Sequence, residues 1–423
     1  MSWLEDIWWR EEAKGPPRAL LAPLALAERV FRAGAAARSA LYDAGLARQV
    51  RAGAPVVSIG NLAVGGAGKT PAVLAVAERL VARGRRVAVL SRGYGARRTD
   101  ARVVSDGARV LLAPEDAGDE PFLLARRLPS SAVLCGPARA ELARRAVEEL
   151  GADTLVLDDG FQHRPLARDV DVVVLDAANP AGNGHLLPRG PNREPWSALS
   201  RASLAWISRV DQAPPGALDA LRERVRAATG RPAVESRHAV TDVLDASLLR
   251  SLGKGALGGR RVLLLCALAR PEGFRRTLAD LGAVVAVERV FRDHHPFTEV
   301  EIEEALRAAA ATGCDVVATT EKDAVRLPPR LAADPRMHVV RISSEIVAGE
   351  EILDALLDAV FATASPSVSS PAAGASGASA RYRERPPASP SIEVGGSAPD
   401  TLPASGGRGH DPSLPTPTRR GDP

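Results

Sequence analysis

SIGNLAVGGAGKTP, residues 58–71, is the stretch from which the expected fold of this chain follows. An apolar run, Pro55–Ile59, leads into it, and a helical pattern from Ala72 to Ala82 follows it. Strand, glycine-rich loop and helix in this order are typical of a P-loop, in which backbone N–H groups and the helix N-terminus bind phosphate oxygens. The stretch therefore predicts a nucleotide site in preference to an ordinary glycine-rich turn before a helix.

The side chains at the end of this loop have expected roles. Lys69 is placed to reach the β- and γ-phosphates, and Thr70 is placed to bind Mg²⁺. Ala63 stands where the strict G-x-x-x-x-G-K-[ST] pattern has its first glycine, which is a departure from that pattern. The backbone expected to contact phosphate belongs to Gly65, Gly66, Ala67 and Gly68.

Composition narrows the class of protein. The chain has 423 residues, 45% apolar and 25% charged, which is long enough for two or three domains. A formal net charge of +4 is small for this length and does not favour nucleic acid as a partner. The three cysteines, Cys135, Cys266 and Cys314, are widely spaced and indicate core thiols in a reducing compartment.

The first fifty residues predict a helical segment for which two interpretations stay open. Trp3, Trp8 and Trp9 precede a helical pattern, and six arginines face two acids between Arg18 and Arg51. Such a helix can lie in a membrane surface, whereas the other interpretation is a helix packed on its own domain. Its longest uncharged run, residues 19–27, falls short of the ~20 residues that span a bilayer, and no secretory signal is expected.

Beyond the P-loop, apolar strands alternate with helices. Strands are expected at 86–91, 132–135, 154–157 and 170–175, with helices at 122–127 and 139–150. A further helix, capped by residues 298–301, is expected to run to Ala311. The alternation predicts an α/β fold of the P-loop NTPase type, a mostly parallel sheet flanked by helices. Four parts are expected: a membrane-associating segment (1–50), a P-loop kinase core (51–212), a smaller C-terminal α/β domain (213–362), and a disordered tail rich in Pro, Ser, Gly and Ala (363–423).

Carboxylates and basic residues follow two of the expected strands. The apolar residues 155–157 are followed by Asp158 and Asp159, which is the form of a Walker B element. Asp158 is expected to hold Mg²⁺. The role of Asp159 stays open. In the long polar loop 182–195, Arg193 is a candidate to pair with phosphate and Glu194 with the metal.

The paired histidines of the FRDHHPF stretch, residues 291–297, invite a zinc interpretation. A third and fourth ligand at metal spacing are missing from the sequence around them, so a polar loop at a strand end is the favoured interpretation.

Two nucleotide-binding classes are disfavoured by their missing motifs. Residues 320–323, TEKD, have the letters of the guanine-reading motif in the wrong spacing. Dimeric switch ATPases carry a lysine where Val64 stands. A kinase or another small-molecule phosphoryl transferase is the favoured class.

The ordered motifs together resemble the tetraacyldisaccharide 4'-kinase family. They are GNLAVGGAGKTP at 60–71, SRGYG at 91–95, GDEP at 118–121, DDGFQHRPLARDVDVVVLD at 158–176, GNGHLLPRGPNREP at 182–195, FRDHHPF at 291–297 and TTEKDAVRL at 319–327. The resemblance covers roughly residues 50–360 and implies transfer of the γ-phosphate of ATP, with Mg²⁺, to the 4'-hydroxyl of tetraacyldisaccharide 1-phosphate in lipid A synthesis. It also implies work at the cytoplasmic face of the inner membrane, with a peripheral segment at 1–50, no nucleic acid and no obligate protein partner.

The resemblance assigns roles that the residues alone leave open. It implies that Asp119 takes the proton of the sugar hydroxyl and that His294 orients or tunes it. Asp158 and Asp159 form the Walker B site in this interpretation, and Lys69 and Thr70 bind phosphates and Mg²⁺. Residues with charge-stabilising or metal-adjacent roles are Arg139, Arg193 and Glu194. The alternative that remains is a P-loop ATPase acting as a membrane-associated switch or partitioning protein.

Overall fold

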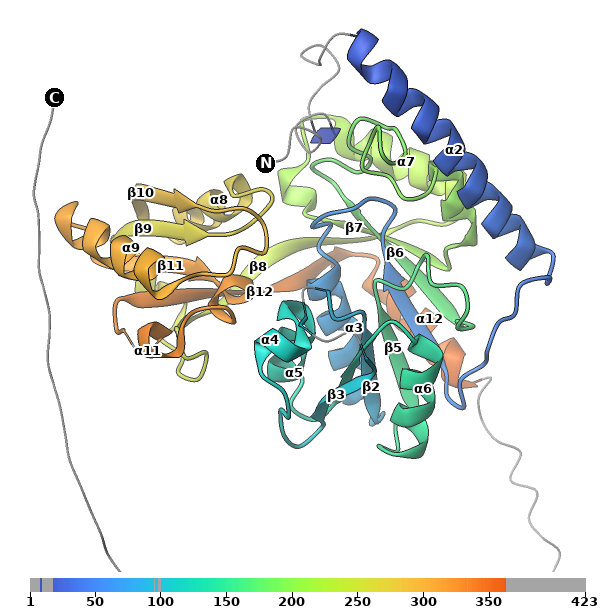
Figure 1. Cartoon of the computed structure of the whole chain (residues 1–423), viewed down its shortest axis with the longest axis horizontal. Coiled ribbons are helices and arrows are strands. Elements are labelled where there is room, and N and C mark those ends of the chain that lie inside the picture. Colours follow the sequence, from blue (N-terminus) through green and yellow to red (C-terminus); the bar gives the residue numbers. More distant parts are fainter. Residues whose placement is uncertain (1–7, 10–17, 95, 98–99, 333, 363–423) are drawn as a thin grey trace, which may run out of the picture. The chain divides into compact units, whose positions relative to one another are not determined.

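A computed structural model describes residues 8–9, 18–94, 96–97, 100–332 and 334–362 (Figure 1). Trp3 and the tail 363–423, for which the sequence predicts a membrane-surface role and disorder, lie outside the described residues. One mixed sheet of twelve strands runs through the described part of the chain, in the order β10-β9-β11-β12-β8-β7-β6-β1-β5-β2-β4-β3.

The P-loop half of the sheet is parallel except at its edge. Its strands are β1 (Val56–Gly60), β2 (Val87–Ser91), β3 (Arg102–Asp106), β4 (Ala132–Cys135), β5 (Thr154–Asp158), β6 (Val170–Asp176) and β7 (Leu204–Ser208). β1 lies between β5 and β6 and is parallel to both, whereas β3 pairs antiparallel with β4. The expected mostly parallel P-loop fold is confirmed.

Helices cover both faces of this half because successive strand residues point to opposite sides. Val57 and Ile59 share a core with α3 (Lys69–Ala82), α5 (Asp119–Arg127) and α12 (Glu350–Ala362). Val56 faces the other side and packs with α6 (Arg139–Glu148). Further along that face, α7 (Ala217–Thr229) and the 3₁₀ turn η2 (Trp196–Arg201) cover β6 and β7. Strands buried on both faces read as continuous apolar runs, which is why the sequence predicts them well.

The second half repeats this layering on a smaller scale. Its strands are β9 (Arg261–Cys266), β10 (Val284–Val290) and β11 (Val316–Thr320), all parallel to their neighbours within this half. α9 (Glu299–Ala311) packs on one face and α8 (Glu272–Asp280) on the other. α9 begins with a capping box between Thr298 and Glu301, as the sequence predicts.

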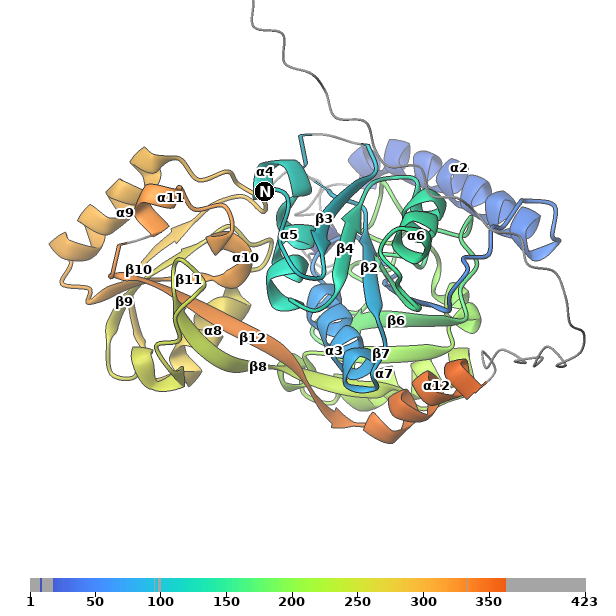
Figure 2. The same cartoon turned by 90° about the horizontal axis from the view of Figure 1, so that it is seen from below.

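Two long antiparallel strands join the halves. β8 (Val234–Asp245) and β12 (Met337–Ala348) pair over ten positions, and Figure 2 shows them running from one half into the other. β8 also pairs with β7, and β12 with β11, so the sheet has no break near residue 213. The sequence does not predict β8, because only the ends of VESRHAVTDVLD are buried and its middle is polar and partly exposed.

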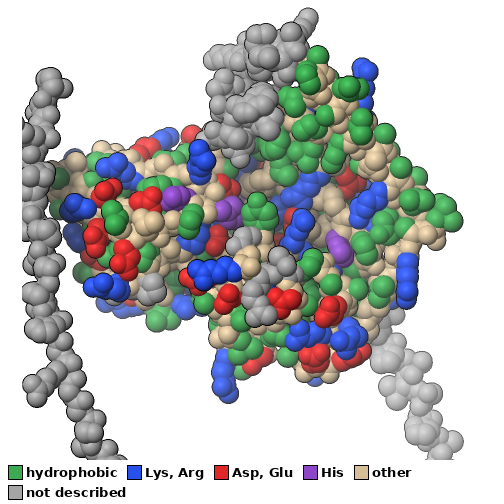
Figure 3. Space-filling view, in the orientation of Figure 1, with side chains coloured by type: hydrophobic (Ala, Val, Ile, Leu, Met, Phe, Trp, Pro, Cys, Tyr) green, Lys and Arg blue, Asp and Glu red, His purple; other side chains and the backbone are tan. Residues whose placement is uncertain are grey.

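The helix α2 (Arg18–Asp43) lies along the outside of the P-loop half in both views (Figures 1 and 2). It leaves apolar side chains uncovered: Leu26 is 65% exposed and Val30 is 69% exposed. Green side chains follow this helix in the space-filling view (Figure 3). None of the described helices combines the length and the apolar content that a membrane crossing requires.

Candidate functional site

The P-loop adopts a conformation that needs glycine at two positions. Gly65 and Gly68 have φ angles of 97° and 86°, in the left-handed region. A Cβ on Gly68 would stand 3.1 Å from both His238 Nε2 and Ser208 Oγ. The tight loop brings Lys69, the first residue of α3, to the C-terminal edge of the sheet. Its Nζ lies 3.2 Å from Asn61 Oδ1 and 3.6 Å from Asp159 Oδ1.

Asp158 ends the neighbouring strand β5 in a buried site. Its side chain is 2% exposed, and its Oδ2 accepts a hydrogen bond from Ser91 Oγ at 2.8 Å. Burial and the carboxylates of Glu120 and Asp159 raise the pKa of Asp158 to about 7. Carboxylates crowded without enough positive charge suit a divalent cation, which would neutralise them.

Glu120 is a member of this group that sequence reasoning missed. It follows Asp119 in the first turn of α5, and it faces Asp158 closely enough to raise that residue's pKa. The signal available in the sequence was the second acid of the GDEP motif. In the described residues, no cluster of three or more His, Cys, Asp or Glu side chains is arranged to hold a metal alone. Mg²⁺ commonly binds one or two carboxylates together with substrate phosphates and water, so the acids present fit that cation.

Asp159 has a different environment from Asp158. Its backbone is left-handed, with a φ of 52°, a conformation that non-glycine residues rarely adopt. Arg193 Nη1 donates to Asp159 Oδ2 at 2.8 Å, and Lys69 Nζ lies 3.6 Å from Asp159 Oδ1. Although burial opposes the charged form, Lys69 and Arg193 lower the pKa of Asp159. The carboxylate is thus ionised and holds the two basic groups that were expected to contact phosphates.

Two of the expected charged residues lie elsewhere. Glu194 is turned to Arg201, whose Nη2 donates to it at 2.7 Å, and its assignment to the metal stays a prediction. Successive side chains in an extended segment point in opposite directions, so Arg193 faces Asp159 while Glu194 faces away from it. Arg139 is 3% exposed and donates to the carbonyl oxygens of Gly136 and Asp158, which places it behind the carboxylate rather than in the open site.

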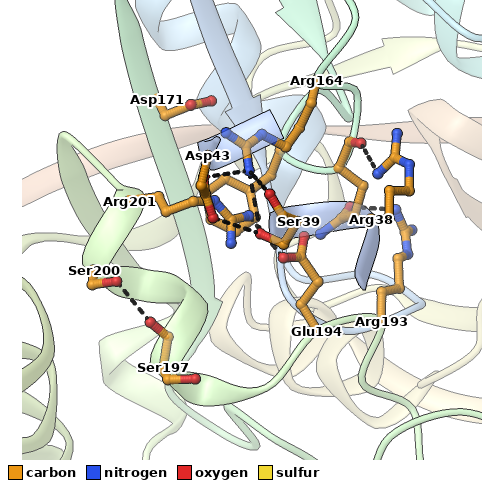
Figure 4. A network of polar contacts seen from close by, with 12 residues as sticks. Arg38, Ser39, Asp43, Arg164, Asp171, Arg193, Glu194, Ser197, Ser200 and Arg201 are labelled. Carbon is orange, nitrogen blue, oxygen red and sulfur yellow. Dashed lines mark hydrogen bonds and ion pairs between the residues drawn. The ribbon is translucent and has the colours of Figure 1, made fainter. Parts of the chain in front are cut away.

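Polar contacts connect α2 with the loop that follows Asp159 (Figure 4). Arg164 pairs with Asp43 at 2.8 Å, and Arg38 donates to the carbonyl of Gln162 at 3.0 Å. The side chain of Gln162 in turn accepts from Arg193 at 3.2 Å. The helix is therefore two hydrogen-bonded steps from the arginine that holds Asp159.

A second constellation forms where α5 meets the loop after β10. His294 Nδ1 lies 3.0 Å from Asp119 Oδ2, although 175 positions separate the two residues. Arg326 Nε lies 3.3 Å from the same oxygen. His294 has a φ of 60°, a left-handed backbone conformation that costs free energy for a residue other than glycine. The surrounding structure holds it there. The structure thus brings together the two residues that the family resemblance pairs.

Lys322 completes this constellation and was not singled out in the sequence. Its Nζ lies 3.2 Å from His294 Nε2 and 3.0 Å from Asp293 Oδ1. An ammonium group can only donate, so Nε2 accepts and the imidazole proton resides on Nδ1. His294 then donates this proton to Asp119 Oδ2.

The adjacent His295 serves the structure. Its Nε2 lies 3.0 Å from each carboxylate oxygen of Glu301, and its ring stacks on Phe291 at 4.7 Å. The two histidines therefore face different partners, in agreement with the preference for a polar loop over a zinc site.

Trp8 and Trp9 contact the protein, which differs from the expected bilayer-facing arrangement. Trp8 Nε1 donates to the Pro188 carbonyl at 2.9 Å. The ring of Trp9 lies over the Arg270 guanidinium at 5.1 Å and borders a small recess beside the P-loop. Both tryptophans are half-buried on these partners.

Comparison with known proteins identifies the family of this chain. The family model described as tetraacyldisaccharide-1-P 4'-kinase matches residues 17–362. A protein named tetraacyldisaccharide 4'-kinase from Anaeromyxobacter sp. (strain Fw109-5) is 69% identical over 362 residues, 86% of this chain and 97% of its own length. A protein of the same name from Syntrophus aciditrophicus is 39% identical over 333 residues, 74% of this chain and 87% of its own length.

Among solved structures, this chain resembles that of LpxK from Aquifex aeolicus in complex with ATP. The TM-score is 0.65 at 28% sequence identity, and the match covers 81% of this chain and 99% of the other. The similarity therefore includes both the P-loop half and the smaller α/β half.

Proposed function

Because the chain belongs to the tetraacyldisaccharide-1-P 4'-kinase family, we propose that its P-loop and the Asp119–His294 pair carry phosphoryl transfer from ATP to the 4'-hydroxyl of tetraacyldisaccharide 1-phosphate. The observation that supports this most directly is the 3.0 Å contact between Asp119 and His294, a carboxylate oriented by an imidazole. The alternative of a switch or partitioning ATPase needs no such pair.

Nucleotide binding in this proposal uses the loop and its lysine. The amides of Gly65–Gly68 and the N-terminus of α3 bind the phosphates, and Lys69 leaves Asp159 to reach them. Thr70, Asp158 and Glu120 would hold Mg²⁺, which neutralises charge on the transferring phosphate when bound. Arg193, next to Asp159, provides further positive charge at the same edge of the sheet.

The acceptor is activated by Asp119. The sugar O–H gives its proton to the Asp119 carboxylate, the sugar oxygen forms a bond to the γ-phosphorus, and the bond from that phosphorus to the bridging oxygen of ADP breaks. Phosphoryl transfer passes through a loose transition state that asks mainly for positioning and charge neutralisation. His294 and Arg326 meet the need for positioning, since both contact the same carboxylate oxygen and hold it in place.

The lipid substrate requires the enzyme to reach a membrane surface. α2 presents exposed Leu26 and Val30 together with arginines, the composition of a helix that lies in the interface with anionic lipid. We place this docking on the cytoplasmic face of the inner membrane, where the family resemblance puts the substrate. The contacts of α2 with the Gln162 loop then link the docked helix to the reacting centre.

The test is transfer of labelled phosphate from ATP to tetraacyldisaccharide 1-phosphate. The wild type should form a labelled lipid, Lys69→Ala should lose ATP-dependent turnover, and Asp119→Asn should lower kcat by about 10²–10⁴-fold with little change in the KM for ATP. A wild type that hydrolyses ATP without labelling the lipid would overturn the kinase proposal. Full activity in Asp119→Asn would remove the proposed base alone.

A further inference from the structure

A groove with excess positive charge lies between α2 and the loop that follows β6. Its free volume is about 340 Å³, and its walls are formed by Ala25, Glu28, Arg29, Arg32, His185 and Arg189. Three guanidinium groups surround one carboxylate there, so the groove has two unbalanced positive charges before His185 is considered. The phosphoryl-transfer step proposed above uses none of these side chains.

Glu28 organises the groove from beneath. It is 4% exposed, and it accepts from Arg32 at 2.6 Å and from the Leu186 amide at 3.2 Å. Arg189 Nη1 and His185 Nδ1 stand 3.5 Å and 3.4 Å from its other oxygen. Although burial opposes its charge, these hydrogen bonds lower the pKa of Glu28, so it remains an anion that gathers the cations.

The cations keep unused hydrogen-bonding capacity. Arg189 Nε is buried without a hydrogen-bond partner among the described residues, an arrangement that costs free energy unless something binds there. The side chain of Arg32 is 56% exposed although one of its nitrogens is held by Glu28. Guanidinium groups with free N–H donors in a recess favour an anion with several oxygens, above all a phosphate.

The loop that supplies His185 and Arg189 is held rigidly. The Asn183 side chain donates to the Arg189 carbonyl at 3.0 Å, and the Asn192 side chain donates to the His185 carbonyl at 2.9 Å. A Cβ on Gly190 would stand 2.2 Å from Asn183 Oδ1, so the chain closes tightly at that glycine. The groove is therefore a formed site rather than a chance gathering of mobile side chains.

The same helix presents an apolar stripe beside the groove. Glu28, Arg29 and Arg32 line the groove, and Leu26 and Val30 lie about 60° and 100° around the helix axis from Arg29. Both apolar side chains are largely exposed. A phosphate in the groove would thus place the acyl chains of the same molecule along α2, which suits a phosphorylated amphiphile better than free phosphate.

The loop also connects the groove to the reacting centre. Asn192 forms a bridge with Ala63 of the P-loop, and the next residue, Arg193, holds Asp159. A disaccharide that offers one end to Asp119 carries its phosphate on the opposite sugar. We propose that this groove binds the 1-phosphate of the lipid substrate, the phosphate that does not react; the assignment rests on the function proposed above.

Two lipids that differ only in the 1-phosphate distinguish binding of this phosphate from general attraction to membranes. We compare tetraacyldisaccharide 1-phosphate with the same lipid lacking its 1-phosphate, measuring KM or, for a poor substrate, competitive inhibition in mixed micelles. The wild type should bind the phosphorylated lipid about ten- to a hundredfold more tightly. Arg189→Ala should remove most of this ratio, chiefly by raising the KM for the phosphorylated lipid, with kcat nearly unchanged. Arg29→Ala changes an exposed residue of the groove wall and should reduce the affinity ratio of the two lipids by a smaller factor. This variant replaces Arg189→Ala if that protein does not fold.

Arg48→Ala is the matched control, because it removes an arginine that follows α2 outside the groove. It should leave the ratio unchanged. An equal effect of Arg189→Ala on both lipids, or no effect on either, would overturn the proposal.

A second measurement tests the bulk lipid headgroup as the ligand. Sedimentation with phosphatidylglycerol and phosphatidylcholine vesicles should respond equally to Arg189→Ala and Arg48→Ala. A larger loss of phosphatidylglycerol binding in Arg189→Ala, with an intact substrate ratio, would assign the groove to bulk anionic lipid and overturn the proposal. A wild type without kinase activity would instead fail the proposed function, which the unmodified substrate tests separately.

Discussion

Lys322 Nζ lies 3.2 Å from His294 Nε2, on the side of the imidazole opposite Asp119. This contact fixes which ring nitrogen has the proton, because a lysine ammonium cannot accept a hydrogen bond. The arrangement directs the Nδ1 proton at Asp119 Oδ2.

Lys322→Ala should lower kcat with little change in the KM for ATP. Without the ammonium, Nε2 loses the donor that selects the tautomer, so the ring can place its proton on Nε2 and present no donor to Asp119. Asp293, which Lys322 now holds at 3.0 Å, would also lose this partner. Steady-state kinetics with ATP and the lipid measure this effect.

Lys322→Arg should restore much of the wild-type kcat, since a guanidinium is also a pure donor. Lys254→Ala is the control for a lost positive charge away from the site. A wild-type kcat in Lys322→Ala would show that this lysine does not orient His294.

Asp158 should make stability depend on pH in the absence of ligands. Burial and the nearby carboxylates of Glu120 and Asp159 raise its pKa from 3.8 to about 7, so the folded state holds a proton that the unfolded chain releases. This contribution is complete below pH 4 and is lost as the pH rises to 7 and above. Asp158→Asn should therefore raise the Tm at pH 8 relative to the wild type and have much less effect at pH 5.

Mg²⁺ provides the complementary measurement. Saturating Mg²⁺ with ATP should raise the Tm of the wild type at pH 8, because the cation neutralises the buried carboxylates, and should raise that of Asp158→Asn much less. Equal Tm shifts in the two proteins would show that Asp158 is not part of the metal site.

Glu321 should be a large contributor to stability where the two halves meet. It is 5% exposed and is held by Arg127 of α5 at 2.9 Å and by Arg341 of β12 at 2.8 Å. Glu321→Ala leaves a buried guanidinium without its partner, so the free energy of unfolding should fall by about 3–5 kcal/mol in urea titrations. The exposed pair Arg237–Glu345 is the control, and Glu345→Ala should change the free energy of unfolding far less.

Membrane docking through α2 should depend on its apolar stripe. The double change Leu26→Asp and Val30→Asp places two charges where the helix would enter the interface, and removal of residues 1–50 deletes the stripe altogether. Both should weaken sedimentation with phosphatidylglycerol vesicles at least several-fold. Leu249→Asp, at a site 79% exposed outside α2, should have no effect. Unchanged sedimentation of the truncated protein would refute the docking role.

Sequence reasoning succeeded where structure depends on neighbours along the chain. The P-loop, the Walker B strand and the capping box of α9 are each formed within one short segment, and their predicted positions are confirmed. It missed β8, whose polar middle gains its pairing from β12, roughly a hundred positions later. It also could not reveal that Arg201 is turned toward Glu194.

The candidate site likewise has one part that neighbouring residues determine and one part that the tertiary structure determines. The phosphate loop could be predicted from residues 58–71 because its donors are consecutive backbone amides and its conformation depends on the local placement of glycine. The group of Asp119, His294, Lys322 and Arg326 depends on the tertiary structure: β12 and β8 carry the sheet from one half to the other and bring α5 against the loop after β10. Proton transfer requires atoms about 3 Å apart, and no pattern along the chain specifies a distance between segments 175 positions apart.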